Sequence, residues 1–197
     1  MVDRRSPLLA LFVDVIIAGV SSPDAIPNAG LVHDRWHARE APYGDFIMFS
    51  DGSLSVMELV RFSPAGQLHD MRAEDWQWRE VLRATAWTPS DWMDVDTTFA
   101  SCTYAGSRAV AGESSDHGSI GWVALTWDDD HNTLEWIAVS RSSNPFTEVT
   151  LDATTVTATS TLGSIWTFPR NTPQQVKITG DPSCPWPSPS QTGGPAG

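Results

Sequence analysis

The chain has 197 residues, of which 41% are apolar and 18% charged, so it is long enough to bury a core and is not disordered throughout. Its 12 basic and 24 acidic residues give a formal net charge of −12, which argues against a nucleic-acid-coating protein and against docking on an anionic membrane surface. Two cysteines are too few for a disulfide-dense mini-domain or a four-cysteine zinc module.

The chain begins with an apolar stretch that has two interpretations. Within residues 7–20 the large apolar side chains recur at helical spacing and Asp14 falls on the opposite face, which predicts an amphipathic helix. Arg4 and Arg5 before this run, and small residues after it, are also typical of a secretory signal peptide. The run is too short to span a bilayer, so we expect no integral membrane association. We predict a cytoplasmic protein, or a secreted one if residues 1–21 are a signal peptide.

One globular domain is predicted, spanning residues 31–180. Residues 1–30 precede it as the apolar segment and a linker. Residues 181–197 are rich in Pro, Gly and Ser and are predicted to form a disordered tail. Cys184 lies in this tail and Cys102 in the domain, and the sequence leaves open whether the two pair.

Local patterns predict a short helix and a hairpin in the first part of the domain. Residues 33–44 are mostly polar and favour a short helix that ends before Pro42. Residues 45–62 place apolar flanks on both sides of Asp51-Gly52, which favours a β-hairpin with a tight two-residue turn.

The segment 71–93 carries helical signals. Asp70 suits an N-cap, and a stripe of side chains at helical spacing follows within residues 71–87. The stripe consists of Trp78, Val81, Leu82 and Thr85. Thr88-Pro89 is typical of the start of a second, short helix.

From residue 94 onward the pattern is β. Strands are predicted near 97–104, 107–111, 118–127 and 133–141, with up to four more between 146 and 179. Both alternating sets of residues 118–127 and 133–141 are largely apolar, so this hairpin is expected to be covered on both faces. The predicted fold class is α+β, mainly antiparallel β (sandwich-like or a curved sheet), with the helical segment near 71–93 packed on it. The predicted core comprises Trp78, Val81, Leu82, Trp122, Leu125, Trp136, Ile137 and Trp166.

Patterns that carry chemistry are incomplete. His33 and His37 would lie one helical turn apart with Glu40 a further turn on, which is half of a zinc site. Residues 112–118 hold the residue types of a hydrolase triad, but triad members converge from separated segments. The acidic turn 128–130 lacks the alternating arrangement of a calcium loop. We therefore predict no catalytic residue, no metal and no cofactor, with His33, His37 and Glu40 as the remaining metal candidates.

Three functions from different classes suit this sequence. The first is an acidic protein-binding module (an adaptor, inhibitor or immunity-type accessory protein) without catalytic activity, whose partner is a protein with a basic surface and not a nucleic acid. The second is an exported carbohydrate-binding module, because ten Trp could supply planes that stack on sugar rings. The third is a hydrolase with a dispersed His/carboxylate site. The predicted binding residues lie at turns and element ends. They are Trp36, Trp92, Arg141, Ser142, Asn144 and Phe146.

Overall fold

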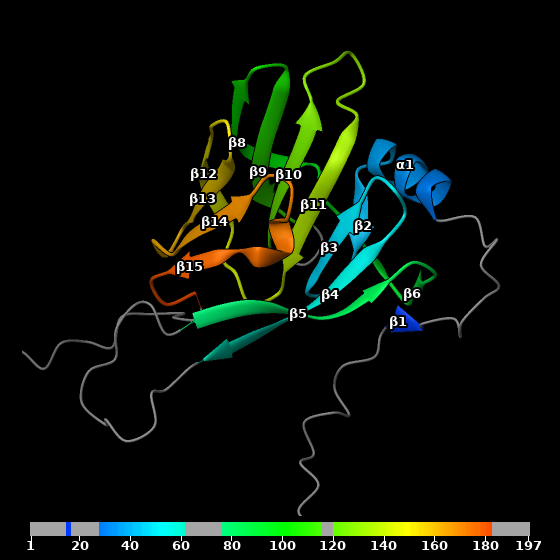
Figure 1. Cartoon of the computed structure of the whole chain (residues 1–197), viewed down its shortest axis with the longest axis horizontal. Coiled ribbons are helices and arrows are strands. Elements are labelled where there is room, and N and C mark those ends of the chain that lie inside the picture. Colours follow the sequence, from blue (N-terminus) through cyan, green and yellow to red (C-terminus); the bar gives the residue numbers. More distant parts are fainter. Residues whose placement is uncertain (1–14, 17–27, 62–75, 116–119, 183–197) are drawn as a thin grey trace, which may run out of the picture.

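The structure is a computed structural model that describes residues 15–16, 28–61, 76–115 and 120–182, and it is built mainly from antiparallel strands (Figure 1). A seven-stranded sheet has the order β5-β4-β3-β11-β10-β9-β8. Its strands are β3 (Phe46–Phe49), β4 (Leu54–Arg61), β5 (Trp76–Ala84), β8 (Thr97–Tyr104), β9 (Ser107–Glu113), β10 (Gly121–Trp127) and β11 (Leu134–Ser140).

A four-stranded antiparallel sheet covers one face of the large sheet. Its strands follow in chain order and are β12 (Phe146–Leu151), β13 (Thr155–Ser160), β14 (Ile165–Pro169) and β15 (Lys177–Thr179), with the short 3-10 helix η2 (Pro173–Gln175) before the last. β12 lies beside β8 and β9, while η2 and β15 lie beside β5 (Figure 1). The two sheets therefore meet near both edges and enclose the first core. Its largest side chains are Trp78, Trp136, Phe146, Trp166 and Phe168.

The opposite face of the large sheet is covered by α1 (Ala29–His37) and by the paired strands β2 (Glu40–Pro42) and β7 (Trp92–Asp94). The segments of chain directly before and after β7 cover this face as well. A second core forms there, and its members include Val32, Trp36, Met48, Trp87 and Trp122. The central hairpin β10–β11 contributes Trp136 to the first core and Trp122 to the second. This confirms the expectation that the hairpin is covered on both faces.

The helical segment predicted near 71–93 is wrong for the residues that the structure describes. Residues 76–84 form β5, and β6 (Thr88–Pro89) and β7 follow it. β5 pairs with β4 along its whole length, and a β-bulge near Val81 shifts the register. Pairing with a neighbouring strand overrides helical spacing here, because the same apolar residues also fit a pleated strand. Residues 62–75, which include the predicted N-cap, lie outside the described part of the chain.

The same error explains two wrong core predictions. Val81 is 56% exposed and Leu82 is 40% exposed. β5 is the edge strand of the large sheet, and Val81 is the extra residue of its β-bulge. The other six predicted core residues are buried: Trp78, Trp122, Leu125, Trp136, Ile137 and Trp166.

The hairpin predicted over 45–62 is confirmed as β3–β4, with a different turn. The Phe49 N–H donates to the Ser53 carbonyl and the Gly52 N–H donates to the Phe49 carbonyl, so the loop has three residues rather than two. Gly52 has a φ of +86°, the left-handed conformation that closes a three-residue hairpin loop.

The first residues of the chain are described only in part. Of the predicted helix over 7–20, the structure describes Val15–Ile16, which is the short strand β1 paired with β6. The short helix expected within 33–44 is present as α1, but it begins at Ala29, inside the predicted linker. None of the described helices is long and apolar enough to cross a membrane. The predicted tail beyond residue 182, with Cys184, lies outside the described residues.

Candidate functional site

The predicted binding loop 141–146 is largely bonded to its own surroundings. The Arg141 side chain is exposed, with its guanidinium 3.5 Å from an Asp45 carboxylate oxygen. Ser142 donates its backbone N–H to Ser140, and Asn144 donates its side-chain amide to the Pro182 carbonyl at 3.5 Å. These contacts fix the loop, and they leave Arg141 as its exposed functional group.

The aromatic members of the predicted site are mostly interior. Phe146 is 2% exposed and packs edge-to-face on Trp166 in the first core, with the ring centroids 5.7 Å apart. Trp36 is 3% exposed, and its indole N–H donates to the Asn132 carbonyl at 2.8 Å. Trp92 is half-buried, with the Arg35 guanidinium 4.4 Å above its ring. Phe146 and Trp36 therefore hold the fold together rather than face a partner.

The pKa of the Asp45 carboxyl is raised. Burial is the largest cause, and it is opposed by the hydrogen bond from the Ser140 hydroxyl (2.8 Å) and by the charge of Arg141. A serine beside a carboxyl still needs a base to become a nucleophile, and the groups that act on Asp45 do not include an imidazole. In residues 112–118, which hold the residue types of a hydrolase triad, Ser114 is buried directly after β9. Residues 116–118 lie outside the described chain.

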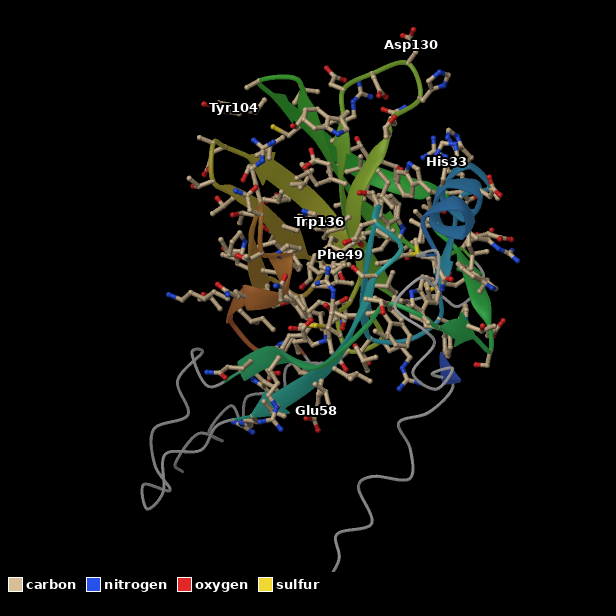
Figure 2. All side chains as sticks on the ribbon, turned by 45° about the vertical axis from the view of Figure 1, so that its right-hand side comes forward. His33, Phe49, Glu58, Tyr104, Asp130 and Trp136 are labelled. Atoms are coloured by element: carbon tan, nitrogen blue, oxygen red, sulfur yellow. The ribbon has the colours of Figure 1, made fainter. Side chains whose placement is uncertain are left out.

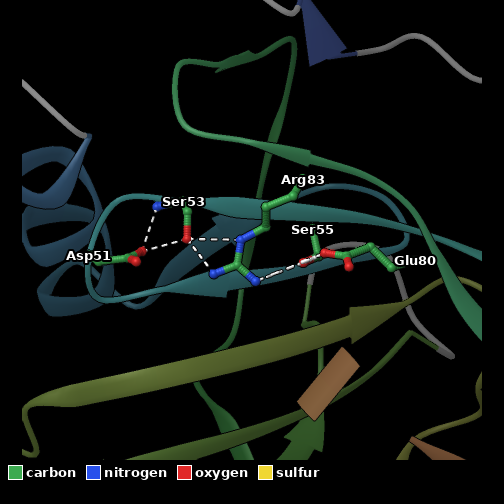
Figure 3. Close-up of polar contacts among 5 residues, drawn as sticks. All are labelled: Asp51, Ser53, Ser55, Glu80 and Arg83. Carbon is green, nitrogen blue, oxygen red and sulfur yellow. Dashed lines mark hydrogen bonds and ion pairs between the residues drawn. The ribbon is translucent and has the colours of Figure 1, made fainter. Parts of the chain in front are cut away.

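A polar network occupies the start of β4 and the end of β5 (Figure 3). Arg83 donates two hydrogen bonds to the Ser53 hydroxyl and one to the Ser55 hydroxyl, and its guanidinium lies 3.6 Å from the Phe49 ring centroid. Glu80 accepts from the Ser55 hydroxyl and lies 3.9 Å from Arg83. These contacts engage each nitrogen of the guanidinium, so the network secures the hairpin and offers little to an added anion.

Burial, the largest single effect on the Asp51 carboxyl in the same network, would by itself raise the pKa of this group. Hydrogen bonds from the Ser53 hydroxyl and backbone N–H and the charge of Arg83 outweigh burial, so the pKa ends below its usual value. Asp51 therefore stays ionised at neutral pH as part of the turn.

The ends of two hairpins form an exposed aromatic surface. Tyr104 and Ser107 pair across the two-residue turn Ala105-Gly106, and Ser107 pairs in turn with Trp127 at the end of β10. Residues in one row across neighbouring strands point to the same face, so Tyr104 and Trp127 flank Ser107. Ser107 is buried, whereas Tyr104 is 43% exposed and Trp127 is 52% exposed.

An acidic turn borders these aromatic side chains. Asp128, Asp129 and Asp130 follow Trp127 directly, and Figure 2 shows Tyr104 and Asp130 at the same end of the molecule. The Asp128 N–H donates to the Gly106 carbonyl at 2.9 Å, which holds the two hairpin ends side by side. We refer to Tyr104, Trp127 and Asp128–Asp130 as the hairpin-end surface.

The acidic turn is rigid. Asp128 accepts two hydrogen bonds from the Arg108 guanidinium, at 2.7 and 3.0 Å. Asp129 accepts from the backbone and hydroxyl of Thr133 and from the backbone of His131, and these bonds lower the pKa of its carboxyl, the Thr133 N–H having the largest effect. Two of the three carboxylates are thus committed to protein contacts, which does not favour a calcium site.

A cleft of about 420 Å³ lies between β5 and the η2–β15 segment. Its walls include Trp76, Trp78, Glu80, Gln174 and Lys177. The buried amide oxygen of Gln174 has no hydrogen-bond partner, whereas the indole N–H of Trp78 interacts with the Asp45 carboxyl and opposes the rise in the pKa of that group. Buried polar atoms are usually satisfied by protein, water or ligand, so the cleft is a second candidate site.

Sequence reasoning missed the hairpin-end surface for a specific reason. Trp127 continues the alternation of Val123 and Leu125, which are both buried in the first core. The pattern therefore predicts a buried Trp127, whereas the side chain at this strand end is 52% exposed. The available signal was its position directly before an acidic turn, since element ends are often exposed.

Comparison of the chain with known protein families, with curated proteins and with solved structures yields no match.

Proposed function

We propose that the chain is a non-catalytic protein-binding module and that the hairpin-end surface binds a partner with a basic surface. The observation that carries this proposal is the pair of exposed aromatic side chains, Tyr104 and Trp127, held on one face beside Asp128–Asp130. Tyr and Trp are enriched among the residues that dominate binding energy at protein interfaces.

Rigidity and charge both support this assignment. The turn is fixed by the Arg108–Asp128 pair and by the hydrogen bonds to Asp129, so little conformational entropy is lost when a partner binds. Asp130 is exposed, and no described contact occupies its carboxylate. A negative field next to aromatic anchors speeds association with a cationic surface and makes the association rate sensitive to salt.

The test is affinity capture of a stoichiometric partner from the native host, followed by measurement of its affinity in purified form. Baits are the wild-type chain, the double variant Tyr104→Ser/Trp127→Ser, and Phe99→Ser. Phe99 is the matched control, because it is 47% exposed on the same strand as Tyr104 but outside the hairpin-end surface.

Two anchors that contribute about 2 kcal/mol each give a loss of about 4 kcal/mol, which should weaken binding by roughly 700-fold. Binding by Phe99→Ser should match the wild type, and added salt should slow association. A partner that binds the double variant as tightly as the wild type would refute the assigned surface. Failure to recover any stoichiometric partner would count against the function itself.

The β5–β15 cleft supports a second candidate function, the binding of a neutral carbohydrate. Its half-buried Trp76 offers an apolar plane, and Gln174 offers an acceptor that lacks a partner. Against it, Trp127 is the one Trp among the described residues whose side chain is mostly exposed (52%), and it lies in a different part of the molecule, so no platform of several Trp is present among the described residues.

This candidate is tested by titrating the protein with neutral oligosaccharides and following Trp fluorescence. A saturable change that Trp76→Ala abolishes and Trp92→Ala preserves would support it, since Trp92 is also half-buried but lies on the opposite face of the large sheet. No saturable change with any sugar would eliminate it.

A further inference from the structure

Three imidazoles gather where α1 meets the β10–β11 turn. His33 and His37 are exposed on the helix, four residues apart, with their ring centroids 4.3 Å apart. His131, from the turn, places its ring centroid 6.3 Å from that of His37. The sequence separation between the helix and the turn hides this arrangement from any local pattern.

The backbone on both sides of this junction is fixed. Trp36, next to His37, donates its indole N–H to the carbonyl of Asn132, next to His131. The Asn132 N–H in turn donates to the Asp129 carbonyl, and the His131 N–H donates to the Asp129 carboxylate at 3.1 Å. The helix and the turn therefore hold the His37 side chain near both His33 and His131, and all three side chains are exposed.

We propose that His33, His37 and His131 bind one divalent transition-metal ion, of which Zn²⁺ is the most suitable. Imidazole nitrogen is a preferred ligand of Zn²⁺, and three His with an open fourth position is a known coordination type. With zinc–nitrogen bonds of about 2.1 Å and a tetrahedral angle at the metal, the ring centroids of two ligands lie roughly 5.2 Å apart. The His33 and His37 rings must therefore separate by roughly 1 Å, and the His37 and His131 rings must approach by roughly 1 Å. Side-chain rotations at these exposed positions permit both movements.

The junction as it stands is not a preformed metal site. Among the described residues no three potential ligands are already arranged to hold a metal, so the proposal requires the imidazole rings to rotate when the ion binds. A hollow of about 130 Å³ lies beside His33 and has room for a water molecule, but its walls do not include His37 or His131.

Glu40, the third ligand suggested by sequence spacing, is placed elsewhere. Glu40 lies in β2, after the helix has ended, and its carboxylate pairs with the Arg35 guanidinium. The structure thus replaces Glu40 by His131 as the third ligand. The variant Glu40→Gln is for that reason the matched control of the test.

The experiment is calorimetric titration of the tag-free full chain with Zn²⁺, together with the absorption spectrum of the Co²⁺ form. The wild type is expected to bind one Zn²⁺ at this site, and the Co²⁺ spectrum is expected to show tetrahedral coordination with imidazole ligands. His37→Ala should abolish this binding, His131→Ala should weaken it at least about tenfold, and Glu40→Gln should leave it unchanged.

Three results would overturn the proposal. The first is an absence of stoichiometric Zn²⁺ binding by the wild type. The second is equal affinity for Zn²⁺ in His131→Ala and the wild type, which would mean that His131 is not a ligand and that only His33 and His37 bind the ion. The third is loss of binding in Glu40→Gln. None of these outcomes depends on the partner-binding proposal, since Tyr104 and Trp127 are unchanged in every variant.

Discussion

Replacing Phe146 by Ala distinguishes a core residue from a binding residue. The side chain is 2% exposed, and truncation of a buried Phe costs about 3–5 kcal/mol. The edge-to-face contact with Trp166 accounts for about 0.5–1.5 kcal/mol of this. Collapse around the cavity is restricted because the Phe146 ring lies against the Gly121 backbone, where even an added Cβ would be 2.8 Å from a ring carbon. We therefore expect a loss of free energy of unfolding in the upper half of this range, about 4 kcal/mol.

The assay is urea unfolding followed by Trp fluorescence. For a slope of about 2 kcal/mol per molar urea, a loss of about 4 kcal/mol lowers the midpoint by about 2 M. The control is Phe99→Ala, whose side chain is 47% exposed and whose loss should change stability by no more than about 0.5 kcal/mol. A midpoint shift below about 0.5 M for Phe146→Ala, or one equal to that of Phe99→Ala, would show that Phe146 does not lie in the core.

Three further predictions test the turns and strand contacts. Ala105 has a φ of +48° in a two-residue hairpin turn, a conformation that Asn adopts more easily than Ala. Ala105→Asn should therefore raise the melting temperature and stabilise the fold by about 1 kcal/mol. An unchanged melting temperature would argue against this turn. A Cβ at Gly112 would lie 1.9 Å from the Thr97 carbonyl oxygen, so Gly112→Ala should destabilise by at least about 3 kcal/mol in urea unfolding, and a neutral effect would contradict the close approach of β8 and β9. Hydrogen bonds, that from the Thr154 N–H above all, lower the pKa of Asp152 to about 2. The ionised Asp152 carboxylate stabilises the fold above about pH 4, and this stabilisation is lost as the pH falls toward 2. Asp152→Asn should therefore flatten the dependence of the urea midpoint on pH between these values. An unchanged slope would contradict this prediction.

The parts of the fold that the sequence predicts are those fixed by neighbouring residues. Asp51-Gly52 between two apolar flanks predicts β3–β4, because a left-handed glycine and alternating apolar side chains act within one hairpin. The β10–β11 hairpin is predicted for the same reason. Its apolar residues on both faces also indicate two covering layers, although they do not identify what those layers are.

The β5 segment shows where local patterns fail. Trp78, Val81 and Leu82 fit one helical stripe, and they also fit a strand with a bulge, so spacing alone does not choose between the two. The choice is made by β4, which offers a complete ladder of backbone partners. A residue's exposure then follows from the strand's place at the edge of the sheet, which depends on the whole topology.

The candidate sites were less predictable than the fold because they depend on contacts between distant segments. Phe146 and Trp127 both lie at strand ends and both are aromatic, yet Phe146 packs on Trp166 in the core and Trp127 is exposed. Likewise His37 meets His131 only because Trp36 reaches Asn132 across 96 positions of sequence. The sequence shows which residue types each site contains. It does not show which of these residues come together, because that depends on how the layers of the fold are arranged.

The β10–β11 turn connects both proposals through one segment. Asp128 joins it to the β8–β9 turn beside the exposed aromatic residues, and Asn132 joins it to α1 beside the histidines. A ligand that binds only the ordered turn favours that state by its binding free energy. If metal and partner both require the ordered turn, each increases the affinity for the other by the same factor. The fixed contacts of Asp128, Asp129 and Asn132 already order this turn, so that factor should be small. Partner affinity measured with and without Zn²⁺ should therefore differ by less than about tenfold, and a larger difference would mean that these contacts are weaker than their geometry indicates.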